Sequence, residues 1–406
     1  MFKKIMCLTL GMASISSYSQ SETPVVAPQD SSEITNSLFD LSIEQLLGID
    51  VVDKRFKFYG YINAYAEKTF HIPDVNASGT TTYHDAPLEW TPAKNFHLYG
   101  SGNLTDNIDV LLNIARTSDD GLELRNAWGN FKIKRNFQVR VGKIYRRFGL
   151  YNEKLDQIPT FIGIEPPELF DVDHLFLTRT TNLMVHGAFN IGSNELLYAF
   201  STENGEGGAA KNVIPLGWDF RYKSASLILG TSGFTSSVTS ERTSATVDFG
   251  KGSPRGGVLP WMQGDRFGVF GAFIEKQAGN LLIQAEYWVS PHQAQRNAEQ
   301  VLTLVREGGI NTNQRQRFLG AAASKVDSTL TTADVVSNVS YVSSTWYLRL
   351  GYNIDSKVGQ FVPYLFLDWM SNPEVVNNKQ YGGDEEAGFA DKGVFFKPSL
   401  GLVYRP

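Results

Sequence analysis

Two groups of charged residues in this sequence could act together on solutes. The first is acidic and lies in the stretch 148–180, where Lys154 is the single base between 152 and 173. Its members are Glu153, Asp156, Glu165, Glu168, Asp171 and Asp173. The second lies on the polar sides of alternating runs and consists of the bases Arg140, Arg221, Lys223, Arg349 and Lys397 and the acids Asp219, Glu286 and Asp368. Acids on an inserted segment opposite bases on a wall would create a transverse field that orients dipolar solutes in a narrow water-filled passage.

A second interpretation of the acidic stretch stays open. The same carboxylates would suit a solvated segment at a cell surface, or one that bridges neighbouring lipopolysaccharide molecules through divalent cations. The two interpretations differ in whether the stretch 148–180 folds into the passage or stays outside it.

The elements that must position these residues are β-strands. From about Phe56 to Pro406, apolar and polar residues alternate in runs of 10–15 residues. The pattern predicts fourteen strands, near 56–68, 95–104, 107–117, 122–134, 137–147, 181–191, 195–203, 214–223, 225–236, 266–277, 280–290, 340–354, 359–371 and 393–405. In the run 214–223, for example, Leu216 and Phe220 share one face, and Asp219 and Arg221 share the other.

The connections between these runs are alternately very short and long. Tight turns at 192–194, 223–225 and 278–280 contrast with the polar stretches 148–180, 237–264 and 291–338. This asymmetry predicts an all-β fold, a transmembrane antiparallel β-barrel with short periplasmic turns and long external loops. The count is 14–16 strands, because 291–338 has room for a further hairpin, although Gln293 to Glu307 resembles a helix more than a strand. A soluble sandwich also alternates, but it turns its aromatic face inward.

Composition agrees with residence in a membrane through strands. Aromatic residues make up 12% of the chain although the mean hydropathy is −0.21, and no run after residue 20 is long and apolar enough for a spanning helix. Aromatics near strand ends would form interfacial girdles; they are Tyr145, Tyr222, Trp288, Trp369 and Tyr404. The net charge of −5 becomes −7 without Lys3 and Lys4, so we expect no nucleic-acid partner.

The N-terminal region has the pattern of an export signal. Lys3 and Lys4 precede a short apolar core, and small residues at 17 and 19 predict a signal peptide over 1–19 that is cleaved after Ser19. Cys7, the single cysteine, lies within it, so the mature chain would have neither disulfides nor thiolate metal sites. We expect 20–53 to be a flexible periplasmic segment with a short amphipathic helix at 38–51, and 54–406 to be the barrel. The segment 38–51 also resembles the one that precedes the plug of TonB-dependent receptors.

Enzymatic motifs are absent from the sequence. It contains no G-x-S-x-G elbow, no H-E-x-x-H and no Walker loop, and its six His are scattered. We therefore expect no enzymatic activity, no cofactor and no metal, and we interpret His186 as a side chain that lines the lumen. Spacing along one chain leaves open an outer-membrane phospholipase or deacylase, which would need a Ser/His pair on the lipid-facing side of the wall.

Three strings resemble one family. RVGKIYRRFGLYNE at 140–153, GGVLPWM at 256–262 and the pair Pro363-Tyr364 are similar to segments of outer-membrane porins of the phosphate-selective porin O/P superfamily. The resemblance implies a 16-stranded trimeric porin whose long loops fold into the lumen. Two features depart from it, because a basic ladder suited to phosphate is not evident and the aromatic-rich last strand ends in Pro406 rather than Phe.

These observations predict an outer-membrane porin. It would pass small hydrophilic solutes or ions by diffusion, contact lipid and lipopolysaccharide, and assemble as a homotrimer. The alternative is a closed barrel that acts as a surface receptor or adhesin through its external loops, above all 291–338. We expect no strong charge preference, because the strand faces favour anions whereas an inserted acidic stretch favours cations.

Overall fold

The computed structural model describes residues 5–9, 56–69, 72–75, 81–84, 87, 89–117, 121–154, 167, 180–202, 214–239, 262–306, 312–374 and 394–405. The chain divides into two compact units, residues 1–127 and 128–406. The described residues of both units belong mainly to antiparallel strands, so the predicted all-β antiparallel class is confirmed.

The first unit contains a run of paired strands and a separate hairpin. Its strands are β1 (Ile5–Thr9), β2 (Phe56–Thr69), β3 (Ile72–Val75), β4 (Thr81–His84), β5 (Glu89–Thr105) and β6 (Ile108–Thr117). β1 pairs with β2, β2 with β5 and β5 with β6, while β3 pairs with β4. β1 falls inside the predicted signal peptide, whereas the predicted cleavage site after Ser19 and the predicted helix at 38–51 lie outside the described residues.

The second unit is a longer antiparallel sheet. Its strands are β8 (Phe137–Tyr145), β9 (Thr180–Ile191), β10 (Asn194–Thr202), β11 (Leu216–Lys223), β12 (Leu227–Thr239), β13 (Met262–Ala278), β14 (Leu281–Arg296), β15 (Asn338–Tyr352), β16 (Ile354–Ser356), β17 (Gly359–Ser371) and β18 (Val394–Arg405). Each strand from β8 to β15 pairs with the next, β15 pairs with β17, and β17 pairs also with β16 and β18. β7 (Gly121–Lys134) runs across the boundary between the two units.

The strand prediction agrees closely with these elements. Apart from the short β1 and β16 and the β3–β4 hairpin, the described residues contain fourteen strands, one for each predicted run. Two of the short connections are two-residue turns, in which Gly192 and Gly279 have positive φ of 62° and 60°. Hairpin turns of this length need positive φ because their twist must match that of the strands.

Alternation gives the sheet of the second unit two different faces. The "polar face" carries Asp219, Glu286, Arg349 and Asp368, all buried, whereas the opposite "apolar face" exposes large side chains, up to 84% for Leu400. Exposed members of the apolar face include Leu216, Phe220, Leu229, Tyr287, Val342, Leu400 and Leu402. A water-soluble sheet would cover its apolar face, so this distribution is the one predicted for a wall with lipid on one side. The girdle prediction is wrong for Tyr145 and Trp288, which are buried.

The stretch between β14 and β15 folds into helices rather than a polar loop. β14 continues to Arg296, and then follow α3 (Ala298–Arg306), α4 (Thr312–Leu319) and the short helices η6 (Gly320–Ser324), η7 (Asp327–Thr329) and η8 (Thr332–Asp334). Asn297 caps α3 because its Oδ1 accepts hydrogen bonds from the N–H groups of Glu299 and Gln300, at 3.1 and 3.2 Å. No helix of the described chain is both long and apolar enough to cross a membrane.

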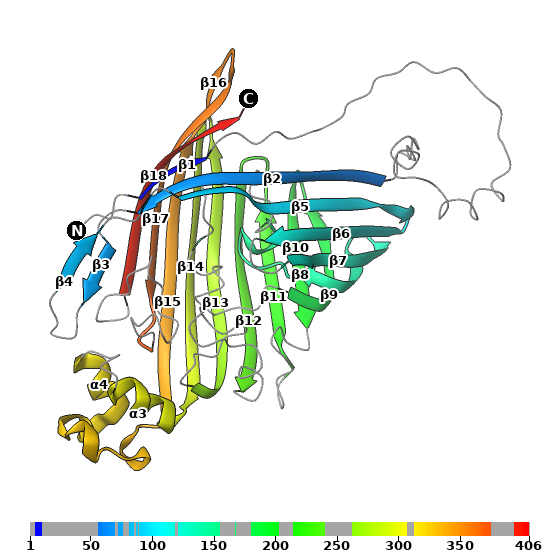
Figure 1. Cartoon of the computed structure of the whole chain (residues 1–406). Helices are drawn as coiled ribbons and strands as arrows, with labels where there is room; N and C mark the ends of the chain where they lie inside the picture. The colour runs from blue at the N-terminus through cyan, green and yellow to red at the C-terminus, as the bar shows by residue number, and fades with distance from the viewer. Residues whose placement is uncertain are drawn as a thin grey trace, which may run out of the picture. The chain divides into compact units, whose positions relative to one another are not determined.

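We call residues 298–335 the helical cap. Its apolar side chains form one cluster with Met262 of β13 and Ala294 of β14, in which Val301, Leu304 and Phe318 are fully buried. The cap lies at the end of β14 and β15 opposite β16 (Figure 1). A buried ion pair lies where the cap follows β14: Nε and Nη2 of Arg296, the last residue of β14, lie 2.9 and 2.6 Å from the carboxylate oxygens of Glu374. The described part of 291–338 contains no additional β-hairpin, which favours fourteen long strands over sixteen.

Candidate functional site

A short segment folds onto the polar face directly after β8. We call residues 146–153 the inner segment; it contains the start of the predicted acidic stretch and ends in the short helix η3 (Asn152–Lys154). Phe148, Leu150 and Tyr151 are buried in one cluster with Phe234, Phe273, Trp288 and Tyr347 of the wall. The Phe148 and Trp288 rings stack with centroids 4.3 Å apart. The inner segment therefore packs against the polar face of the sheet, beside Phe273, Trp288 and Tyr347.

Glu286 of β14 holds the middle of the inner segment. Its Oε1 accepts hydrogen bonds from the Leu150 N–H at 2.8 Å and from the Tyr347 hydroxyl at 2.6 Å. Its Oε2 accepts one from the Trp288 indole N–H at 2.9 Å. A buried carboxylate needs such donors to offset its lost hydration, so Glu286 and the inner segment stabilise each other's positions.

Gly149 lies at the closest approach of the inner segment to the wall. Its φ is +55°, and a Cβ on this residue would lie 2.3 Å from Glu286 Oε2. Its N–H donates to Ser232 Oγ at 3.1 Å, and its carbonyl accepts from Arg221 Nη2 at 2.9 Å. Both the backbone conformation and the contact require glycine at this position.

A charged cluster lies beside this turn. Arg221 donates through Nε to Asp219 Oδ1 at 2.7 Å, and its Nη2 lies 3.3 Å from Glu153 Oε2. Arg147 Nε lies 3.5 Å from the same Glu153 oxygen. Burial alone would raise the pKa of Glu153, but the positive charges of Arg147, Arg221 and Arg140 outweigh it and lower the pKa to about 2. Glu153 is therefore a carboxylate at neutral pH and joins the inner segment to the bases of the wall.

Tyr151 makes a further contact between the inner segment and the sheet. Its hydroxyl donates to Gln284 Oε1 at 2.7 Å and accepts a hydrogen bond from Arg349 Nη1. Burial raises the pKa of Tyr151 well above its ordinary value, although the neighbouring Arg349 opposes this. The Arg349 guanidinium also lies over the Phe366 ring, 4.1 Å from its centroid.

Strand register aligns four of the predicted wall residues in one row. Arg221 is opposite Gly230, which is opposite Phe273, and that residue is opposite Glu286. Across the next strands Glu286 is opposite Tyr347, Tyr347 is opposite Asp368, and Asp368 is opposite Lys397. Arg221, Glu286, Asp368 and Lys397 thus lie at one level of the polar face, while Asp219 and Arg349 lie two residues away along their strands on either side of it.

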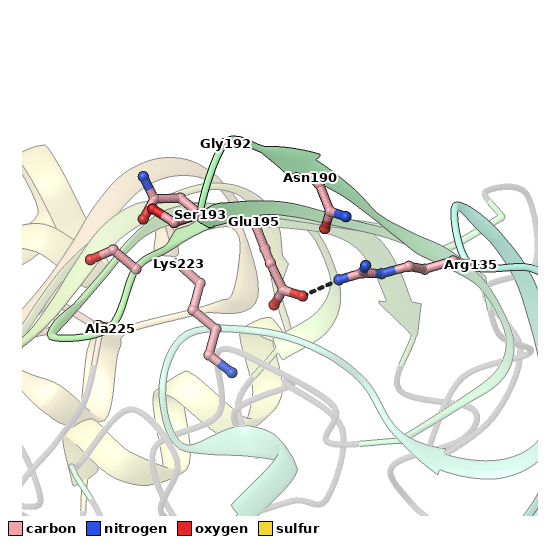
Figure 2. Close-up of a pocket in the computed structure, with 9 residues that line it drawn as sticks. Arg135, Asn190, Gly192, Ser193, Glu195, Lys223 and Ala225 are labelled. Atoms are coloured by element: carbon pink, nitrogen blue, oxygen red, sulfur yellow. Dashed lines mark hydrogen bonds and ion pairs between the residues drawn. The ribbon is translucent and has the colours of Figure 1, made fainter.

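Two predicted wall residues lie away from this row. Arg140 of β8 lies over the Trp128 ring, 4.0 Å from its centroid. Lys223 is exposed at the rim of the short turns, where it lines a depression of about 400 Å³ together with Ser193, Ser224 and the paired Arg135 and Glu195 (Figure 2). The structure therefore does not bring Lys223 to the inner segment.

The remaining predicted site residues belong to the acidic stretch. Asp156, Glu165, Glu168, Asp171 and Asp173 lie outside the described residues, so Glu153 alone represents the acidic group here. His186 lies on the polar face, as expected, with Nε2 2.7 Å from Asn130 Oδ1. Within the described ranges no group of His, Cys, Asp or Glu could hold a metal ion.

Several residues of this site were not predicted from the sequence. Phe148, Gly149 and Tyr151 have no charge, and Ser232 and Tyr347 lie on other strands, so no local pattern indicated their roles. The string RVGKIYRRFGLYNE at 140–153 carries the family resemblance, and its last eight residues are the inner segment. This resemblance is the one feature of the sequence from which a functional role of residues 146–153 could have been predicted.

Comparisons with known proteins give similarity in structure only. No protein-family model and no curated protein matches the chain. A loop L8 deletion mutant of OmpT, an outer membrane protein of Vibrio cholerae, has a TM-score of 0.41 at 10% identity, covering 78% of this chain and 82% of that one. A porin structure refined at 1.8 Å gives 0.37 at 9% identity, covering 86% and 89%. OmpF of Salmonella typhi in complex with daunomycin gives 0.36 at 9% identity, covering 86% and 97%.

Proposed function

We propose that this chain is an outer-membrane porin through which small hydrophilic solutes or ions diffuse. The observation that supports it best is the reversal of the two faces, with large apolar side chains exposed on one and charged side chains buried on the other. A sheet in lipid needs this arrangement, and it must close on itself because an open edge would leave backbone groups without partners. The strands would then form one barrel with the polar face inside.

The inner segment is the proposed constriction of this channel. It carries Glu153 to the basic side chains of the wall and is held there by Glu286, Ser232 and Gln284. The acids from Asp156 to Asp173 continue the same stretch and would complete the negative side of a transverse field. Because field lines focus at the narrowest level, this segment would dominate selectivity.

The family resemblance supplies the finer proposal. Similarity to the phosphate-selective porin O/P superfamily supports a homotrimeric porin in contact with lipid and lipopolysaccharide. Since no basic ladder is evident, we propose a general or weakly selective channel, whose transport by diffusion needs no cofactor. Export would remove residues 1–19, and residues 20–53 would stay in the periplasm.

Conductance tests the proposal directly. The full-length mature protein, purified in detergent and shown to be folded by a heat-modifiable gel band, should insert into planar bilayers and give discrete ohmic steps. A folded preparation that gives no steps at any voltage would rule out the channel.

A surface receptor or adhesin is the second candidate. The helical cap favours it, because helices packed in an apolar cluster with Met262 and Ala294 of the sheet offer a more defined surface than a polar loop. The Arg296 N–H donates to the Ser337 carbonyl at 2.6 Å, so the two ends of the cap adjoin and a short Gly-Ser turn can replace residues 298–335. A porin lacking the cap should keep or increase its conductance, whereas a closed receptor should conduct neither with the cap nor without it.

A further inference from the structure

Three side chains on the polar face form a relay near the base of the helical cap. Ser290 Oγ lies 2.8 Å from His292 Nε2, and His292 Nδ1 lies 2.6 Å from Asp265 Oδ2. Nucleophile, base and orienting carboxylate are therefore each within hydrogen-bond reach of the next, which is the geometry that activates a serine. We propose that Ser290, His292 and Asp265 form a nucleophilic centre for small acyl esters.

The imidazole is held in one orientation. His292 stacks on Tyr341 with ring centroids 4.4 Å apart and an interplanar angle of 6°, and on Phe267 at 5.4 Å and 17°. The Tyr341 hydroxyl donates to Asp265 Oδ2 at 3.3 Å. Asp265 comes from β13, Ser290 and His292 from β14, and Tyr341 from β15, so the orientation depends on three paired strands. A ring held with Nδ1–H directed at a carboxylate presents Nε2 to the Ser290 hydroxyl as the acceptor of its proton.

A further hydroxyl lies opposite the nucleophile. Ser343 of β15 is the register partner of Ser290 and shares its face. Its Oγ is buried and has no hydrogen-bond partner among the described residues. Directly opposed side chains have Cβ atoms about 4.5–5.5 Å apart, a spacing that allows one hydroxyl to attack a carbonyl carbon while the other donates to its oxygen. Ser343 thus has the position of an oxyanion donor.

The reaction balances without any cofactor. Ser290 Oγ bonds to the ester carbonyl carbon as its proton passes to His292 Nε2, and the electron pair of the C=O bond moves onto the oxygen facing Ser343. When that pair returns, the bond to the leaving alkoxide breaks and His292 protonates the alkoxide. Water then attacks the acyl-serine, giving its proton to His292, and Ser290 Oγ recovers that proton as the carboxylic acid leaves.

Burial restricts the substrate class. Ser290, His292 and Asp265 are 2%, 4% and 3% exposed, so a long acyl chain would not fit without moving the wall. An acetyl-sized ester is therefore the expected substrate. This activity goes beyond the proposed transport function, and its test does not depend on conductance.

The test uses the folded full-length protein in detergent. Diisopropyl fluorophosphate should add one phosphoryl group to the peptide that contains Ser290, as read by mass spectrometry, and p-nitrophenyl acetate should be hydrolysed above the buffer rate. His292→Ala should lower that rate by about 10²-fold or more, because a positioned general base contributes about that much. Ser290→Ala should abolish both signals, whereas Ser201→Ala, a buried serine of β10, which pairs with neither β13 nor β14, should change neither.

Two outcomes would overturn the proposal. One is a folded wild-type protein that gives no adduct on Ser290 and no hydrolysis above buffer, which is the behaviour of a purely structural network. The other is hydrolysis that persists in Ser290→Ala. If Ser290→Ala does not fold, as judged by its heat-modifiable band, the site of the adduct in the wild-type protein decides the question. Conducting channels without esterase activity would reject this inference and leave the proposed porin function intact.

Discussion

Gly149 and Glu286 approach each other so closely that a methyl group on residue 149 would lie 2.3 Å from the Glu286 carboxylate. The carboxylate has no room to retreat easily, because it accepts hydrogen bonds from Leu150, Trp288 and Tyr347. This contact makes the position of the inner segment sensitive to single atoms.

Gly149→Ala should displace the inner segment. The positive φ costs a non-glycine residue on the order of 1–3 kcal/mol, and the clash adds to this cost. We expect a lower unfolding temperature of the heat-modifiable band and a larger or noisier single-channel conductance. Gly192→Ala is the matched control, because φ there is +62° but a Cβ would meet nothing within 4 Å. Equal effects of the two changes on conductance would show that the contact with Glu286 does not hold the segment.

Glu286→Ala should release the same segment by removing its acceptor. The buried Leu150 N–H and Tyr347 hydroxyl would lose their partner, at a cost of about 1–3 kcal/mol each. Chemical denaturation should show the loss in the free energy of unfolding. Glu195→Gln, which removes an ion pair with Arg135 at the exposed turn rim, should change stability by no more than about 1 kcal/mol.

Glu153 should give the channel an acid transition. Its pKa is lowered to about 2 from an ordinary 4.5, so its contribution to stability is fully present above pH 4.5 and is lost as the pH falls towards 2. In the folded channel Glu153 keeps its charge until the pH approaches its lowered pKa of about 2. Its part of any conductance change should therefore appear only as the pH falls towards 2, and Glu153→Gln should remove that part. Asp334 in the helical cap also has a pKa lowered to about 2, chiefly by its hydrogen bond from Lys325, yet Asp334→Asn should leave conductance at every pH unaffected.

Glu374→Ala should loosen the helical cap. It leaves the buried Arg296 guanidinium without its carboxylate, a change that costs about 3–5 kcal/mol. Limited proteolysis should then cut within 298–335 faster than in the wild-type protein. Asp327→Asn removes the partly exposed Arg315–Asp327 ion pair and should leave the cleavage rate nearly unchanged. Equal protection in both variants would mean that the Arg296–Glu374 pair does not fasten the cap.

Neutralising Glu165, Glu168, Asp171 and Asp173 together should shift ion selectivity towards anions. These acids would form the negative side of the proposed constriction, where charge has its strongest effect on permeating ions. The reversal potential under a salt gradient measures the shift. Neutralising Asp327 and Asp334 of the helical cap is the control and should not move it. An unchanged reversal potential and conductance in the quadruple variant would assign these acids to the outer surface.

Local periodicity accounts for what the sequence could predict. Leu216, Asp219, Phe220 and Arg221 reveal their faces because strand side chains alternate regardless of their partners. Arg221 and Lys397 lie in the same row because of the register between each pair of neighbouring strands. The sequence of a single strand does not contain that information. Likewise Gly149 owes its role to Glu286, far away in the chain, and the relay joins Asp265 to His292 across two strands. The helix in 291–338 was anticipated, but Gln293 to Arg296 extends β14, because their inner side chains pack on the wall.

The adjoining ends of the helical cap bear on how the chain folds. β14 and β15 begin to pair at the cap, where the Arg296 N–H meets the Ser337 carbonyl. Without the cap, bringing these strands together would mean closing a long flexible loop, whose entropic cost grows with its length. If the cap folds first, its two ends lie next to each other before β14 and β15 pair. The entropic cost of pairing these two strands is then close to that of a hairpin with a short turn. The cap would thereby lower the effective contact order of the longest strand pair and speed its assembly.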